Sequence, residues 1–173
     1  MESDITDDPC CGSLGTDASR LMAERGSLVG FRIDIRAGRL GTDFRRADFS
    51  SADFNGNLFN GIRFACATFR LATLSRCYFL SCDFRRARMQ GATLRGASFS
   101  ACDLRAADLR DVDLRDARFE IANKSGGRVG TNLADVNLEG ANLRGVRYVR
   151  ETIWPEGFDL EGSGAILDDT LRR

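Results

Sequence analysis

The feature that most constrains this chain is a period of five residues. From Thr42 to Phe119, every fifth residue is Phe, Leu or Met without exception. Two residues before most of these positions the chain has Ala or Cys. One large and one small apolar side chain are therefore expected to point inward in every five residues. The aromatic members of the series are predicted to form the structural core: Phe44, Phe49, Phe54, Phe59, Phe64, Phe69, Phe79, Phe84, Phe99 and Phe119.

A period of five fits neither an α-helix nor a flat strand. In a helix, five residues turn a side chain through about 500°, and in a strand five steps place it on the opposite face. The chain must instead turn back every five residues, as in a square coil with one five-residue segment on each side. Four sides make a coil of about twenty residues, and stacked coils pair as parallel strands ~4.8 Å apart. This arrangement is a solenoid, in which each coil contacts only its neighbours.

Several phrases of the sequence resemble the repeat of a known family. ADFSSADF (Ala47 to Phe54), ATLRGASF (Ala92 to Phe99), ADLRDVDL (Ala107 to Leu114) and ANLRG (Ala141 to Gly145) are similar to the A-[D/N]-[L/F]-x-x signature of pentapeptide repeat proteins. The resemblance covers about Thr42 to Tyr148. It implies an all-β fold, a right-handed quadrilateral β-helix of about five to six coils. For function it implies only that the better-known members bind other proteins.

The segments outside the repeats divide the chain into four parts. Residues 1–15 are predicted to be a disordered arm, and residues 16–41 an N-terminal cap made of a short helix and a strand, with Leu21 and Met22 on the buried side of the helix. Residues 42–149 form the β-helix, with an interruption at 120–130 where the period slips. That interruption is either a functional loop or an inserted segment at a coil corner. Residues 150–173 leave the period and are predicted to be a tail or cap that packs Trp154 and Phe158 onto the last coil.

The residue types that most catalytic sites need are missing. The 173 residues include no histidine, which excludes Ser/His and Cys/His pairs, and no phosphate-binding loop is recognisable. The aspartates that precede the large residues are interpreted as the outward polar position of the repeat. We therefore expect no enzyme activity and no cofactor. The six cysteines have no metal-binding spacing, so no metal site is expected, and the thiols are predicted to be reduced.

The start of the chain predicts a cytoplasmic protein. Residues 1–15 carry Glu2, Asp4, Asp7 and Asp8 and have no basic or apolar stretch of the kind that begins a secretory signal. No apolar run approaches the ~18 residues of a membrane span, so no membrane contact is expected.

The charge distribution weighs against two functions. The chain is neutral overall, with 25 basic and 25 acidic residues, but the repeats are rich in arginine. Members of the resembling family that protect DNA gyrase are thought to imitate negatively charged DNA, so the basic repeats disfavour a gyrase or topoisomerase protection factor. A stripe of Arg45, Arg46, Arg85, Arg86 and Arg105 could bind nucleic acid directly. The aspartates between these arginines make that alternative less favoured.

One face of the predicted coil is apolar on its outside. A step of twenty residues stacks Phe59, Phe79, Phe99 and Phe119 inward on this face. The candidate interface residues that flank them outward are Leu58, Tyr78, Leu80 and Ile121. An exposed apolar face on a soluble protein indicates a binding partner. The predicted function is a non-enzymatic protein-interaction scaffold, acting on an unknown protein partner or as a homodimer, unless a terminal segment covers this face.

Overall fold

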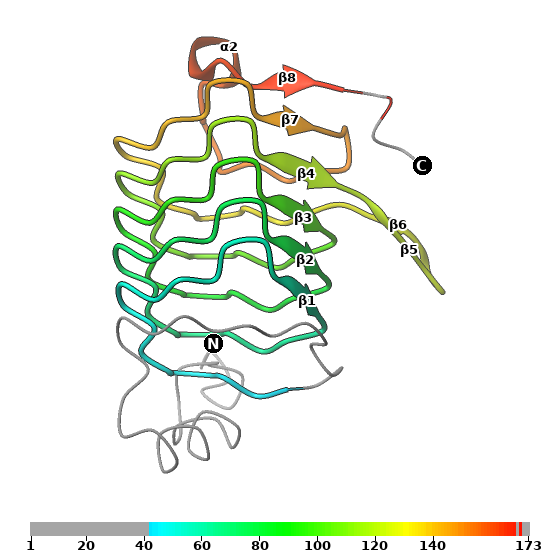
Figure 1. Cartoon of the computed structure of the whole chain (residues 1–173). Coiled ribbons are helices and arrows are strands. Elements are labelled where there is room, and N and C mark those ends of the chain that lie inside the picture. The colour runs from blue at the N-terminus through cyan, green and yellow to red at the C-terminus, as the bar shows by residue number, and fades with distance from the viewer. Residues whose placement is uncertain (1–41, 169, 171–173) are drawn as a thin grey trace, which may run out of the picture.

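A computed structural model describes residues 42–168 and residue 170. The chain winds into a β-solenoid whose coils stack in one direction (Figure 1). Each regular coil has four sides of five residues. We number the four faces by their inward residues in one coil: Phe64 for the first face, Phe69 for the second, Leu74 for the third and Phe79 for the fourth. This is the quadrilateral β-helix that the period predicts.

The fourth face is the most regular part of the solenoid. Within residues 42–168 its sheet contains six parallel strands in the order β1 (Leu58–Asn60), β2 (Tyr78–Leu80), β3 (Ser98–Ser100), β4 (Arg118–Glu120), β7 (Arg147–Tyr148) and β8 (Ile166–Leu167). The register steps by twenty residues from β1 to β4, so that Phe59 lies beside Phe79 and Phe79 beside Phe99. Residues twenty apart in the sequence therefore lie on adjacent strands, which are joined by a ladder of backbone hydrogen bonds.

The other three faces are held by single bridges rather than by strands. On the first face Asp43 pairs with Arg63, on the second Asp48 with Thr68, and on the third Asp53 with Thr73. The same register continues through the later coils. Between the bridges the chain makes tight corners in which one residue has a positive φ, for example Arg76 at 57°. Corner residues in this conformation turn the chain back after each five-residue side.

The ten phenylalanines of the repeat series fill the axis of the solenoid, each less than 5% exposed. Along the fourth face the rings of Phe59 and Phe79 stack at 5.0 Å, and those of Phe79 and Phe99 at 4.9 Å. Rings on neighbouring faces meet edge to face, as Phe79 and Phe84 do at 5.1 Å. The small residues of the second column, Ala and Cys, lie beside them and are also buried.

The interruption at 120–130 is a β-hairpin. Strands β5 (Ala122–Lys124) and β6 (Gly127–Val129) pair antiparallel and project from the stack after β4 (Figure 1). Phe119 pairs with Tyr148, twenty-nine residues later, so this coil holds nine more residues than a regular coil of twenty. The hairpin takes up these extra residues, which is why the coil stack continues in register beyond it. The structure shows an inserted hairpin at this corner, and whether it is a functional loop or only an inserted segment stays open.

The C-terminal segment packs Trp154 and Phe158 against the core, as predicted, and it also continues the coil although its sequence leaves the period. Ile153 bridges Asn132 on the first face, and β8 adds the sixth strand to the fourth face. Trp154 follows Ile153 and packs edge to face on Phe119 at 5.6 Å, while its ring stacks on Phe158 at 5.4 Å. Between these parts lies the short helix α2 (Leu160–Ser163), capped by the side chain of Asp159. The tail is a sixth, irregular coil.

The predicted helix and strand at 16–41, with Leu21 and Met22, lie outside the described residues, as does the arm at 1–15, so these remain predictions. Within the described part of the chain, no helix is both long enough and apolar enough to cross a membrane.

Candidate interaction surface

Three exposed apolar side chains lie together on the outer side of the six-stranded sheet. Leu58 of β1 and Tyr78 of β2 are register partners, and Leu80 follows two residues after Tyr78 on the same side. Their exposed fractions are 50% for Leu58, 56% for Tyr78 and 39% for Leu80. We call these three residues the apolar patch. β2 pairs with β1 on one side and with β3 on the other, and β1 pairs with β2, so backbone hydrogen bonds hold the strands that carry the patch.

Ile121, the fourth predicted interface residue, is not part of the patch. Its side chain is buried at 7% exposure, and its carbonyl oxygen accepts a hydrogen bond of 2.7 Å from the Ser100 hydroxyl. The residue directly follows β4 at the base of the hairpin, where the nine-residue insertion changes the direction of the chain. The outward position that the period predicts is therefore wrong for Ile121.

The patch ends at the third strand of the sheet. Ser98, the register partner of Tyr78 on β3, is buried at 4%. Beyond it, the same column carries the exposed arginines Arg118 and Arg147, and Arg147 pairs with Asp168 at 3.0 Å. The outer side of the sheet is thus apolar over its first two strands and basic over the fourth and fifth.

A recurrent Asp-x-Arg motif joins neighbouring charges on the outside of the coil. In each case the aspartate accepts one hydrogen bond from the backbone N–H two residues later and at least two from the guanidinium of that same residue. The N–O ion-pair distances lie between 2.6 and 2.9 Å for Asp43–Arg45, Asp83–Arg85, Asp103–Arg105, Asp108–Arg110 and Asp113–Arg115. This geometry is a bidentate pair closed within one turn.

The pKa of the carboxyl group is lowered in four of these pairs, at Asp43, Asp103, Asp108 and Asp113. The hydrogen bonds from the Arg110 guanidinium hold the pKa of Asp108 below its usual range, and those from Arg115 do the same for the pKa of Asp113. For Asp103, burial raises the pKa, but the hydrogen bonds and charge of Arg105 outweigh it and the net pKa is lowered. In these four pairs the motif keeps the carboxylate ionised and the arginine partly neutralised.

The Asp-Arg ion pairs reduce the positive charge of the predicted arginine stripe. Arg45, Arg85 and Arg105 each carry the aspartate two residues before them as an ion-pair partner, and Arg85 also approaches Asp103 at 3.8 Å. Arg46 and Arg86 also have interaction partners. The stripe therefore presents much less open positive charge than its arginine count indicates.

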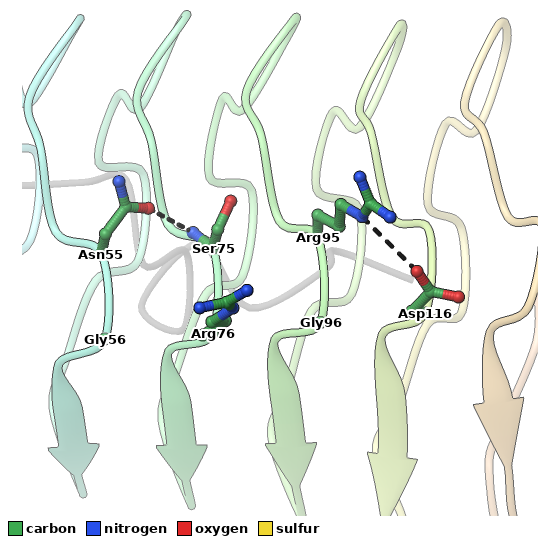
Figure 2. A pocket seen from close by; sticks show the side chains of 7 residues that line it. All are labelled: Asn55, Gly56, Ser75, Arg76, Arg95, Gly96 and Asp116. Atoms are coloured by element: carbon green, nitrogen blue, oxygen red, sulfur yellow. Dashed lines mark hydrogen bonds and ion pairs between the residues drawn. The ribbon is translucent and has the colours of Figure 1, made fainter.

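A groove follows the corner between the third and fourth faces. It encloses about 750 Å³ and is lined by Asn55, Gly56, Ser75, Arg76, Arg95, Gly96 and Asp116. Figure 2 shows that these residues come from four successive coils, directly before the strands of the sheet. The Arg95 Nε approaches the Asp116 carboxylate at 3.4 Å, and Asn55 Oδ1 accepts a 2.8 Å hydrogen bond from the Ser75 backbone N–H. We call this feature the corner groove.

A second depression continues the corner groove along the stack. It encloses about 270 Å³ between Arg95, Arg115, Asp116 and Arg144. Because Arg95 and Asp116 line both hollows, the two form one channel along the corner.

The cysteines of the second column are buried structural residues. The Cys77 thiol donates to the Phe54 carbonyl oxygen at 3.0 Å, and burial raises its pKa to about 12. Cys82 and Cys102 are also free and buried. Cys66, which lies at a corner, is disulfide-bonded, so the prediction of six reduced thiols is wrong at this position. No group of three or more metal-ligating side chains gathers anywhere in the described ranges.

The repeat pattern matches a known family. A family model for the pentapeptide repeat region matches residues 52–124. The solved structure of alr5209, a pentapeptide repeat protein from Nostoc Pcc 7120, is 34% identical over 72% of this chain and 86% of its own, with a TM-score of 0.45. The chain belongs to the pentapeptide repeat family.

Two further solved structures are similar to this chain at lower identity. A trypsin-treated form of QnrB1, a plasmid-mediated fluoroquinolone resistance protein, is 23% identical over 83% of this chain and 92% of its own, with a TM-score of 0.42. A pentapeptide repeat protein from the Arabidopsis thaliana thylakoid lumen is 22% identical over 70% of this chain and 67% of its own, with a TM-score of 0.32. Among curated proteins, no match to the chain was found. Similarity this distant transfers no function.

Sequence reasoning located the apolar patch but missed the corner groove. The signal that could have found it is the residue two positions before each arginine. Thr93 and Asn142 stand where the Asp-x-Arg motif would have an aspartate, so Arg95 and Arg144 have no carboxylate within their own turn. Two of the four arginines that line the channel are of this kind.

Proposed function

We propose that this protein is a non-enzymatic scaffold that binds another protein through the apolar patch. The observation that carries the proposal is the exposure of Leu58, Tyr78 and Leu80 side by side on a regular sheet. Large apolar side chains that cluster on a fixed backbone lose water on binding and need no reordering of the chain, so they favour association. The matching positions of β3 and β4 carry serine, arginine and glutamate, which limits the patch to one end of the sheet.

Two other features support an interaction role over catalysis or nucleic-acid binding. The sequence contains no histidine and no recognisable catalytic motif. The arginines of the predicted stripe are paired with aspartates, which weakens the attraction of that stripe for phosphates. The partner is either a second copy of this chain or a different protein.

A pair of double variants tests the proposal. Leu58→Asp with Leu80→Asp places two charges in the patch, whereas Leu71→Asp with Ile153→Asp makes the same change at two exposed residues outside the sheet. We expect both to stay folded by circular dichroism. Only the patch variant should lose self-association in light scattering or lose the protein captured from lysate of the native host.

Other outcomes would overturn the proposal. If the patch variant keeps every interaction, or if the control variant loses them equally, the patch is not the interface. If the patch variant unfolds while the control variant does not, the patch is covered within the monomer by another segment of the chain.

A further inference from the structure

We propose that the corner groove binds an extended acidic segment of the partner that occupies the apolar patch. The inference rests on the proposed function and adds the chemistry of the partner to it. It follows from three observations: the excess of arginines over carboxylates along the channel, the position of the groove beside the patch, and the polar character of its lining.

The channel carries a net positive charge. Among the described residues, Arg76 and Arg144 make no ion pair, and Arg95 reaches Asp116 only through a 3.4 Å contact between side chains that are 58% and 63% exposed. Arg115, the remaining arginine of the channel, is neutralised by Asp113. Three arginines against Asp116 leave a formal charge of +2, which attracts carboxylates.

The backbone at this corner makes room for the arginine side chains. Gly96 has a φ of +66°, and a Cβ added there would lie 3.8 Å from Cγ of Arg76. The Arg76 side chain therefore lies across the glycine of the next coil, and Gly56 leaves the preceding coil open with no atom within 4 Å of an added Cβ. Alternation of glycine with long side chains produces the hollow (Figure 2).

The groove and the patch are contiguous. Gly56 and Arg76 line the groove, and two residues later the chain reaches Leu58 and Tyr78 of the patch. A single partner segment can therefore contact both. Coils repeat at ~4.8 Å, and an extended chain rises about 3.3 Å per residue, so about five residues along the corner would pass Arg76, Arg95 and the arginines beyond them. The complementary segment has several acidic residues next to one or two large apolar ones.

A peptide fits the groove better than a nucleic acid does. Asp116 lies in the middle of the channel, where it would repel a continuous row of phosphates but could accept a hydrogen bond from a peptide N–H or hydroxyl group. No aromatic side chain lines either hollow, so unpaired bases would find no surface on which to stack.

Fluorescence anisotropy with two labelled peptides tests the inference on the full chain. The probe is fluorescein-labelled Glu-Glu-Glu-Glu-Gly-Leu-Phe, and the matched peptide has Gln in place of each Glu. We expect saturable binding of the acidic peptide at low salt. Arg76→Gln with Arg95→Gln should weaken the binding roughly 2- to 30-fold, which corresponds to the loss of two exposed charge contacts of about 0.2 to 1 kcal/mol each. The Gln peptide should bind more weakly and respond little to these substitutions.

Arg105→Gln with Arg110→Gln is the matched control, because it removes the same net charge from Asp-paired arginines outside the groove. Equal weakening by both double variants would show a net-charge effect and overturn the inference. Competition by single-stranded DNA that is stronger than that of unlabelled acidic peptide would show a nucleic-acid site instead.

The patch variant of Leu58 and Leu80 separates this inference from the proposed function. If the patch variant no longer binds the acidic peptide while the groove variant still binds it, the patch is a binding surface and the corner groove is not a site for acidic segments. If only the groove variant loses the peptide, the groove is a site in its own right and the patch proposal fails.

Discussion

Replacement of Phe79 by alanine should be the most damaging kind of change to this fold. Phe79 is 2% exposed and lies at the centre of the phenylalanine ladder. Its ring stacks on Phe59 at 5.0 Å and on Phe99 at 4.9 Å, and it meets Phe84 edge to face at 5.1 Å. The substitution removes all three ring contacts at once.

The size of the loss in the free energy of unfolding depends on how little the structure around residue 79 can relax. Truncation of a buried Phe to Ala costs about 3 to 5 kcal/mol, with larger values where a cavity remains open. Here the backbone on both sides is pinned by hydrogen bonds between coils, such as Ser81 N–H to the Ser100 carbonyl at 2.9 Å. Collapse around the cavity would break these bonds, so we expect a loss in the free energy of unfolding of about 4 to 5 kcal/mol.

Urea denaturation followed by circular dichroism measures this loss. Arg95→Ala is the control for an outward position and should change the free energy of unfolding by less than about 1 kcal/mol. Phe79→Leu should cost about 1 to 2 kcal/mol, because leucine fills the same inward position at Leu74 and Leu94. Equal denaturation midpoints for Phe79→Ala and Arg95→Ala would refute the ladder as the source of stability.

Three further predictions concern the corners, the ion pairs and the thiols. Gly96→Ala should lower the free energy of unfolding, measured by urea denaturation, by about 1 kcal/mol because Gly96 has a φ of +66°. Gly126→Ala should leave the free energy of unfolding unchanged, and equal losses for the two variants would refute a backbone effect. The pKa of Asp113 is lowered by its hydrogen bonds from Arg115, so the ionised pair stabilises the fold above the ordinary pKa of 3.8, and this stability is lost as the pH falls through the folded-state pKa. Arg115→Gln should therefore lose less stability between pH 5 and pH 2.5 than the unchanged chain, and an identical acid profile would contradict the pairing. Cys77, with its pKa raised to about 12 by burial, should resist iodoacetamide in the folded protein and react in urea, and rapid labelling of the folded chain would show that the site opens.

The fold could be predicted because its information is local and repeated. Each five-residue side specifies its own inward residue, and a step of twenty residues assigns Phe59, Phe79 and Phe99 to one column. Errors arose where the repetition stops. The nine-residue insertion buries Ile121, which the period places outward, and the sixth coil forms around Trp154 without the repeat signature.

The apolar patch could be predicted from the sequence, but the corner groove could not, because it depends on which arginines form ion pairs with aspartates. The period alone places Leu58, Tyr78 and Leu80 on the outside, as the structure has them. The groove depends on pair geometry within single turns, and a charge count along the sequence does not distinguish a paired arginine such as Arg105 from an open one such as Arg76.

The most direct test of the account is photo-crosslinking from the patch itself. Tyr78 is replaced by p-benzoylphenylalanine, the full chain is irradiated in lysate of the native host, and the crosslinked peptides are identified by mass spectrometry. Leu71, which is 66% exposed at a corner away from the sheet, receives the same group as the control. The account predicts discrete crosslinks from position 78, to partner segments that carry acidic residues beside apolar ones, and none of these from position 71. Identical crosslinks from both positions, or none from position 78, would contradict a binding surface on the six-stranded sheet.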